Sequence, residues 1–166
     1  PGLGKSRLIS ELVRRLGDGA TIVSAHCDAT GGATFAPLAE ALRGLLRLDD
    51  GVSTAAVRAA IASRMADDAP ERTRVAAGVA ALLAGMPAAP EETFFVVRRF
   101  LVALAAVQPV VLAIDDLQWA EPLLLDLVEH LVQWSTDAPL LVLVAARPEL
   151  RDARSSLTIP GGLVSD

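Results

Sequence analysis

The chain has 166 residues, of which 52% are hydrophobic and 21% are charged. This length and composition suit one folded domain with a hydrophobic core and argue against a disordered chain. The formal net charge of -5 argues against direct nucleic-acid binding through this segment.

The apolar patterns predict alternating helices and strands, with no linker that would divide the chain. In order, they predict a helix over 5–16, a strand over 20–25, helices over 37–48, 53–66, 72–84 and 93–106, a strand over 109–114, a helix over 122–134 and a strand over 139–145. The last two strands are continuous apolar runs, typical of parallel strands covered on both faces. The pattern predicts a three-layer α/β domain in which helices flank a mostly parallel sheet. Residues after Leu150 are expected to form a loop.

The chain opens with the string PGLGKS at residues 1–6 and passes directly into the first predicted helix. This string matches the last six positions of the Walker A phosphate loop, whose first glycine would lie before residue 1. Glycines let backbone N–H groups surround phosphate oxygens, and the positive end of the following helix points at the same anion. Lys5, the only lysine among 15 basic residues, offers a mobile ammonium to the β- and γ-phosphates, and the Ser6 hydroxyl is a ligand for Mg²⁺. The residues expected to bind the nucleotide are Gly2, Leu3, Gly4, Lys5, Ser6 and Arg7.

The strand over 109–114 runs directly into two carboxylates, Asp115 and Asp116. An apolar strand with this ending is typical of a Walker B strand. Asp115 is then expected to hold Mg²⁺, mainly through its water shell, and Asp116 to orient or deprotonate the attacking water. The alternative is an ordinary buried strand that ends in a solvated turn, and the phosphate loop upstream favours the first interpretation.

Arg147 follows the strand over 139–145. The carboxyl ends of parallel strands meet at the ligand crevice. Arg147 is therefore expected to contact the γ-phosphate and to report its presence. Together with Lys5 and Asp116, it is a candidate catalytic residue. The alternative is a surface arginine that caps the turn before Pro148.

Other residues carry weaker signals. His26, Cys27 and Asp28 follow a predicted strand, but no second cluster in the sequence supplies the remaining ligands of a metal site. Trp119 and Trp134 are interpreted as packing residues.

Four segments occur in the order typical of one family: GLGKSRL at 2–8, APLAEAL at 36–42, VLAIDDLQWAE at 111–121 and LVAARPEL at 143–150. Together they resemble the AAA-type P-loop ATPase domain of the bacterial signal-transduction ATPases with numerous domains. That family includes large ATP-binding LuxR-type regulators and ATPase-linked nucleotide cyclases. The resemblance covers essentially the whole chain and implies ATP and Mg²⁺ as ligands.

The resemblance also assigns places within the domain. Residues 1–166 would form a single partial domain that supplies the second, third and fourth core strands, with a helical insertion between the second and third. The first and fifth core strands would lie outside the chain. Arg147 matches the family's sensor position on the fourth strand, and Asp116 matches its second carboxylate.

In function, the resemblance implies an ATP-binding, slowly hydrolysing regulatory switch within a larger signalling or transcription-regulating protein. Its expected partners are ATP and ADP, the output and helical domains of the parent chain, and further copies in nucleotide-dependent self-association. Two alternatives stay open: a non-hydrolysing nucleotide-gated scaffold, and a motor-like AAA+ ATPase acting on DNA or protein. The motor would use Arg98 or Arg99 as an arginine finger in trans, although a solvated helix face is the favoured interpretation of both.

The location of the protein is inferred from two absences in the sequence. Cys27 is the only cysteine, which rules out a disulfide within the chain and fits a reducing compartment. The longest uncharged stretch, residues 75–90, is interrupted by glycine and proline and is too short to span a bilayer. We therefore expect a cytoplasmic protein with no membrane contact.

Overall fold

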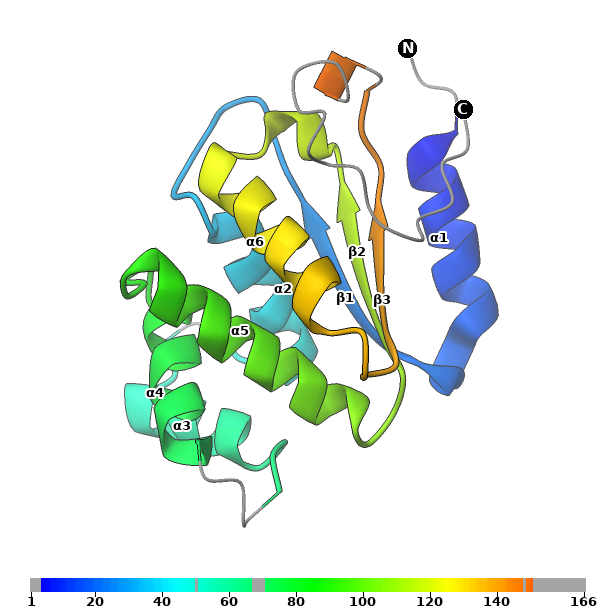
Figure 1. The fold of residues 1–166 in the computed structure, drawn as a ribbon. Coiled ribbons are helices and arrows are strands. Elements are labelled where there is room, and N and C mark those ends of the chain that lie inside the picture. Colours follow the sequence, from blue (N-terminus) through cyan, green and yellow to red (C-terminus); the bar gives the residue numbers. More distant parts are fainter. Residues whose placement is uncertain (1–3, 50, 67–70, 148, 151–166) are drawn as a thin grey trace.

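The computed structural model describes residues 4–49, 51–66, 71–147 and 149–150 (Figure 1). The elements follow in the order α1 (Lys5–Leu16), η1 (Gly17–Gly19), β1 (Thr21–His26), α2 (Ala36–Leu46), α3 (Thr54–Ala62), α4 (Arg72–Leu83), α5 (Pro90–Ala105), β2 (Val110–Asp115), η2 (Leu117–Trp119), α6 (Pro122–Trp134) and β3 (Leu140–Val144). The loop predicted after Leu150 lies outside the described residues. Among the described residues, no helix combines the length and the hydrophobicity that a membrane span requires.

The three strands form one parallel sheet in the order β1-β2-β3. Ile114 of β2 lies opposite Val144 of β3, and the last residues of β1 and β2, His26 and Asp115, are partners across the sheet. The carboxyl ends of the strands therefore meet at one edge of the sheet. The predicted α/β fold, with helices flanking a parallel sheet, is confirmed.

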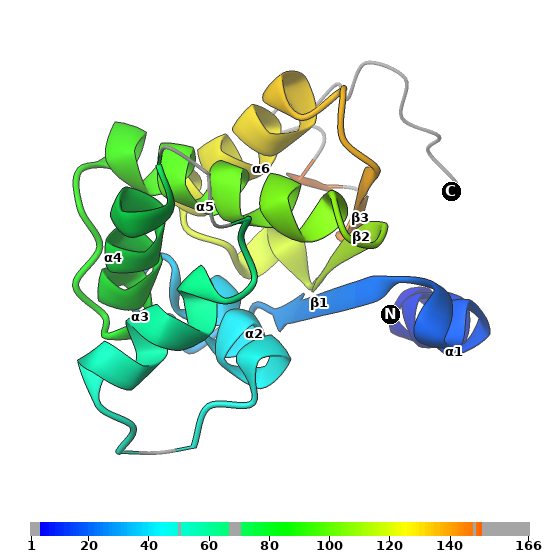
Figure 2. The same cartoon turned by 90° about the horizontal axis from the view of Figure 1, so that it is seen from below.

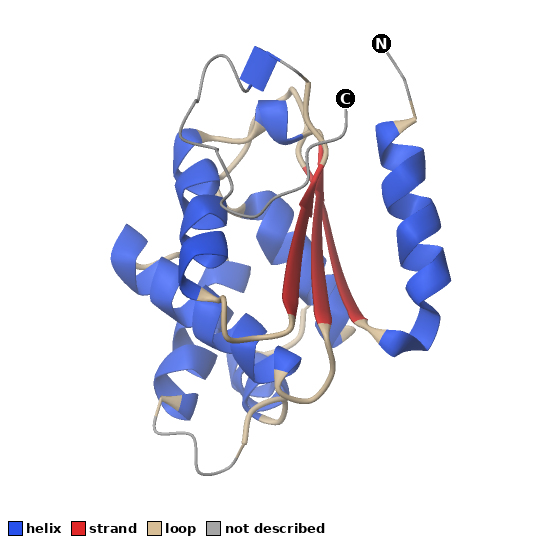
Figure 3. Ribbon diagram, turned by 45° about the vertical axis from the view of Figure 1, so that its right-hand side comes forward, coloured by secondary structure: helices blue, strands red, loops and turns tan. Residues whose placement is uncertain are grey.

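Helices cover the two faces of the sheet unequally (Figure 3). α1 lies alone on one side of the sheet, and the other helices lie on the opposite side. Because side chains alternate along a strand, Val110, Leu112 and Ile114 join the large core formed with these helices. Val111 and Ala113 belong to the other face, on the side of α1, and are also buried.

β3 departs from the expected coverage. β2 is buried along almost its whole length, whereas β3 is only partly buried, and the Leu141 side chain is 49% exposed. Leu141 lies opposite Val111 and so belongs to the face on the side of α1, but no residue of β3 lines the cleft between α1 and the sheet. The prediction of strands covered on both faces is therefore correct for β2 and wrong for β3 in the described part of the chain.

The helices between β1 and β2 form the predicted helical insertion. α3 packs on α4, α4 packs on α5 and also contacts α2, so α3 and α4 lie on the side of the molecule away from α1 (Figure 2).

Two helix boundaries differ from the predicted ones by three residues or more. α5 begins at Pro90 rather than at 93, because proline suits the first turn and Glu91 and Glu92 favour its positive end. α3 ends at Ala62 rather than at 66. The carbonyl of Ala62 accepts a hydrogen bond from Nε of Arg72 at 3.0 Å.

Candidate functional site

The amino-terminal end of α1 carries the predicted phosphate-binding residues. Gly4 precedes the helix in the left-handed conformation, at φ 81°, which suits glycine. Lys5 is the first residue of α1, and Ser6 and Arg7 follow with exposed side chains. Unpaired N–H groups and the positive end of the helix dipole make this position attractive to anions. The other two residues of the predicted loop lie outside the described residues, namely Gly2 and Leu3.

An open cleft of about 380 Å³ separates α1 from the sheet. Ser6 lies on its helix wall and Asp115 on its sheet wall, so the two predicted magnesium ligands line the same cleft. The remaining lining residues are Ile9, Ser10, Val13 and Arg14 of α1, Ser24, Ala25 and His26 of β1, and Ala113 of β2. An open cleft with a hydroxyl and a carboxylate on facing walls can hold a polar ligand together with a hydrated cation.

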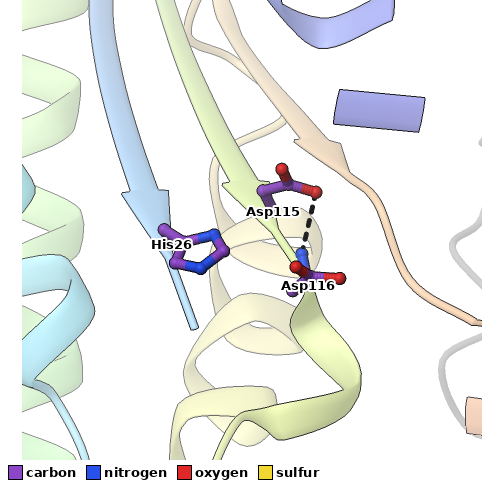
Figure 4. Close-up of side chains that lie close together, drawn as sticks. All are labelled: His26, Asp115 and Asp116. Atoms are coloured by element: carbon purple, nitrogen blue, oxygen red, sulfur yellow. Dashed lines mark hydrogen bonds between the residues drawn. The ribbon is translucent and has the colours of Figure 1, made fainter. Parts of the chain in front are cut away.

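Asp115 and Asp116 differ in backbone conformation. Asp115 is the last residue of β2 and shares a strand face with Ala113, which places its carboxylate on the cleft side of the sheet. Asp116 takes the left-handed conformation at φ 54°, which aspartate tolerates better than most residues other than glycine. The backbone N–H of Asp116 donates a hydrogen bond to Oδ1 of Asp115 at 2.9 Å. The two carboxylates therefore lie side by side at the end of β2 (Figure 4).

Backbone hydrogen bonds on both sides hold this turn. The N–H of Cys27, just beyond β1, donates to the carbonyl of Asp115 at 3.0 Å. The N–H of Leu117 donates to the carbonyl of Ala145, just beyond β3, at 2.9 Å. The position of the acidic pair is thus set by both neighbouring strands.

Gln118 connects Asp116 with Arg147, and the sequence analysis did not identify it. Its Nε2 donates to Oδ1 of Asp116 at 2.8 Å, and its Oε1 accepts from the backbone N–H of Arg147 at 3.1 Å. The guanidinium of Arg147 lies over the ring of Trp119. The sequence signal for this contact is that Gln118 follows Asp116 by two positions. At this spacing the Gln118 amide can turn back to the Asp116 carboxylate.

His26 joins the acidic pair, which was not predicted. One donor atom from each of His26, Asp115 and Asp116 lies within 4.8 Å of the other two (Figure 4). The sequence offered no second cluster beside His26, and the structure brings Asp115 and Asp116 to it from the next strand of the sheet. The parallel pairing of the two strands, seen in the structure, places His26 beside Asp115.

The two residues after His26 stay outside this cluster. Cys27 is 1% exposed and belongs to the core on the far face of the sheet. Burial raises the pKa of its thiol to about 11, and the nearby Asp116 carboxylate acts in the same direction, so the thiolate that binds metals is not formed at neutral pH. Oδ1 of Asp28 accepts hydrogen bonds from the backbone N–H and the hydroxyl of Thr30 in the following loop.

The arginines considered as arginine fingers have partners within the chain. Arg99 forms an ion pair with Glu71 at 2.7 Å, and both side chains are about one third exposed, at 33% and 32%. Arg98 donates to the backbone carbonyl of Trp134 at 3.2 Å.

Both tryptophans are more exposed than the packing interpretation implied. The exposed fractions are 43% for Trp119 and 64% for Trp134. Trp119 lies beneath Arg147, and Trp134 lies beside His130, with ring centres 6.3 Å apart.

Comparison with known proteins gives one finding. A family model described as an AAA ATPase domain matches residues 1–143, which include the predicted phosphate-loop residues, both carboxylates and most of β3. A search of the curated proteins and a search of the solved structures found no significant match.

Proposed function

The chain belongs to the AAA ATPase domain family, and on that premise we propose that it is an ATP-binding, slowly hydrolysing regulatory module of a larger signalling or transcription-regulating protein. The observation that carries the proposal is that Ser6 of α1 and Asp115 of β2 line one cleft. These oxygen ligands fit Mg²⁺, which neutralises phosphate charge when it is bound with a nucleotide. ATP and ADP are the proposed ligands.

The amino-terminal end of α1 is the proposed phosphate-binding site. The left-handed Gly4 turns the chain into the helix, so the N–H groups of the first turn face the phosphates. The backbone of residues 2–7 and the Lys5 ammonium are proposed to hold the β- and γ-phosphates. The first turn of α1 contains no acidic residue that would repel them.

The different proposed roles of Asp115 and Asp116 follow from their positions. Asp115 faces the cleft and is proposed to hold the water shell of the magnesium ion together with Ser6. Asp116 has one oxygen occupied by Gln118, which orients the carboxylate and leaves its second oxygen as an acceptor for the proton of an attacking water. Arg147, tied to the same Gln118, is proposed to contact the γ-phosphate.

The arginine contacts favour a regulatory module over a motor-like ATPase. A motor assembled into a ring needs an arginine that reaches the neighbouring copy. Arg99 is engaged by Glu71 and Arg98 by the carbonyl of Trp134. The non-hydrolysing scaffold differs from the leading proposal only in the role of Asp116, and turnover measurements separate the two.

Calorimetric titration of Mg-ATP into the protein tests the proposal. Lys5→Ala should weaken binding at least about tenfold, because it removes a charge-assisted contact to phosphate. Arg15→Ala is the matched control, since Arg15 is a cation in the last turn of the same helix, where it pairs with Glu11. The control should bind Mg-ATP as the unaltered protein does.

Two results would count against the proposal. Folded full-length protein that binds no Mg-ATP would remove the nucleotide function altogether. Equal weakening by Lys5→Ala and Arg15→Ala would show a general charge effect and not a phosphate site. Thermal unfolding of each variant verifies that the fold is retained.

A further inference from the structure

We propose that His26, Asp115 and Asp116 form a binding site for a divalent transition-metal ion that fills without nucleotide. The three residues come from the ends of two adjacent strands, and one donor atom from each lies within 4.8 Å of the other two. This inference goes beyond the proposed nucleotide function, because it needs neither a phosphate group nor the loop before α1.

The imidazole changes the metal preference of the cluster. Two carboxylates alone suit Mg²⁺ or Ca²⁺, which take oxygen ligands. An imidazole nitrogen is a favoured ligand of zinc, iron, nickel and copper, and carboxylates bind manganese as well. A nitrogen and two carboxylate ligands, with the rest of the coordination sphere open to water, therefore fit Zn²⁺ or Mn²⁺ better than Mg²⁺.

The geometry needs only a small adjustment to close around an ion. Ligand atoms that lie about 2.1 Å from one ion are about 3 to 4.2 Å apart from each other. The separations here reach no more than 4.8 Å. The His26 side chain is exposed, so a rotation of this side chain can supply the approach.

Hydrogen bonds already orient both carboxylates. Oδ1 of Asp115 accepts from the backbone N–H of Asp116, and Oδ1 of Asp116 accepts from Nε2 of Gln118. Each carboxylate keeps its second oxygen for a metal. Such partners around the ligands hold them in place and are typical of functional metal sites.

The test measures Zn²⁺ binding to the untagged, nucleotide-free chain by calorimetry, with Mg²⁺ in a parallel titration. We expect one equivalent of Zn²⁺ to bind more tightly than Mg²⁺. His26→Asn should weaken Zn²⁺ binding at least about tenfold and change Mg²⁺ binding by less than about twofold, because only the nitrogen ligand is lost. Asp137→Asn is the matched control, an exposed carboxylate before β3 at the opposite end of the sheet, and should bind Zn²⁺ as the unaltered protein does.

A spectroscopic measurement identifies His26 directly as a ligand of the metal ion. With Mn²⁺ as the probe, electron spin echo measurements should detect the nitrogen of one coordinated imidazole, and His26→Asn should remove that signal. Equal Zn²⁺ affinities of the unaltered protein and His26→Asn, or a preference of the unaltered protein for Mg²⁺, would overturn the inference. Mg-ATP binding is measured separately on His26→Asn, so failure of the nucleotide function is distinguished from failure of the metal site.

Discussion

The guanidinium carbon of Arg147 lies 5.3 Å from the centre of the Trp119 ring. This contact joins the segment after β3 to η2, the turn that follows the acidic pair. A cation over an exposed indole face gains about 0.5–1 kcal/mol, which is less than a charge-assisted bond to phosphate supplies. The proposed contact of Arg147 with the γ-phosphate would therefore draw the guanidinium away from the ring, and the emission of Trp119 would report the move.

The first prediction uses this contact as an optical signal. The chain has two tryptophans, so Trp134→Phe leaves Trp119 as the single emitter. Mg-ATP should change the emission of Trp119 more than Mg-ADP does, because only ATP offers a γ-phosphate to Arg147. Adding Arg147→Ala in the same background should remove the difference between the two nucleotides. If Mg-ATP and Mg-ADP still change the emission of Trp119 to different extents in Arg147→Ala, a residue other than Arg147 detects the γ-phosphate.

The second prediction separates chemistry from backbone strain at Asp116. Asp116→Asn keeps a residue that tolerates φ 54° and keeps an oxygen for Gln118, so stability should change by less than about 0.5 kcal/mol. ATP turnover should fall by about 100-fold or more, because the amide accepts no proton. Steady-state phosphate release with matched Mg-ATP affinities measures this.

Asp116→Ala is the companion variant. It should lose turnover as well, and should also lower the free energy of unfolding by about 1 kcal/mol, because alanine resists the left-handed conformation. No measurable turnover in the unaltered protein, together with unchanged Mg-ATP binding in Asp116→Asn, would favour the nucleotide-gated scaffold.

Prediction from sequence succeeded where the signal was local. The apolar runs before Asp115 and Arg147 and the helix after Lys5 are continuous patterns, and the structure places the corresponding elements at nearly the predicted bounds. His26 was set aside because its partners are 89 and 90 positions further along the chain. A residue pattern does not state which strands are neighbours, so only the sheet pairing reveals the cluster. The exposure of Leu141 was missed for the same reason, since the coverage of a strand depends on where distant helices pack.

The third prediction concerns acid sensitivity through His130. Burial lowers the pKa of His130, and the nearby Arg98 acts in the same direction; its Nε2 is buried without a hydrogen-bond partner among the described residues. The unfolded chain therefore binds this proton more readily than the native protein. The stabilising contribution is complete above the ordinary histidine pKa of about 6.5 and is lost as the pH falls through that value toward the lowered native pKa.

His130→Phe removes the titrating group and fits beside the rings of Phe94 and Trp134. Urea unfolding at pH 7.5 and pH 5.5 should show a smaller loss of stability in His130→Phe than in the unaltered protein. Equal losses in both proteins would assign the acid sensitivity to other groups.

The last prediction contrasts two glycines in helices. A Cβ added at Gly78 of α4 would lie 2.7 Å from a methyl carbon of Val96 in α5, and Val96 is 1% exposed and β-branched, so it has no free rotamer. The gain of about 1 kcal/mol in helix propensity is outweighed by an overpacking cost of about 1–3 kcal/mol, and Gly78→Ala should lower the free energy of unfolding. Gly44→Ala in α2 meets no atom within 4 Å and should raise it by about 0.5–1 kcal/mol. Urea unfolding of both variants measures the contrast, and Gly78→Ala should cost less in a Val96→Ala background, because the two methyl carbons that lie 2.7 and 3.0 Å from the new Cβ are then absent.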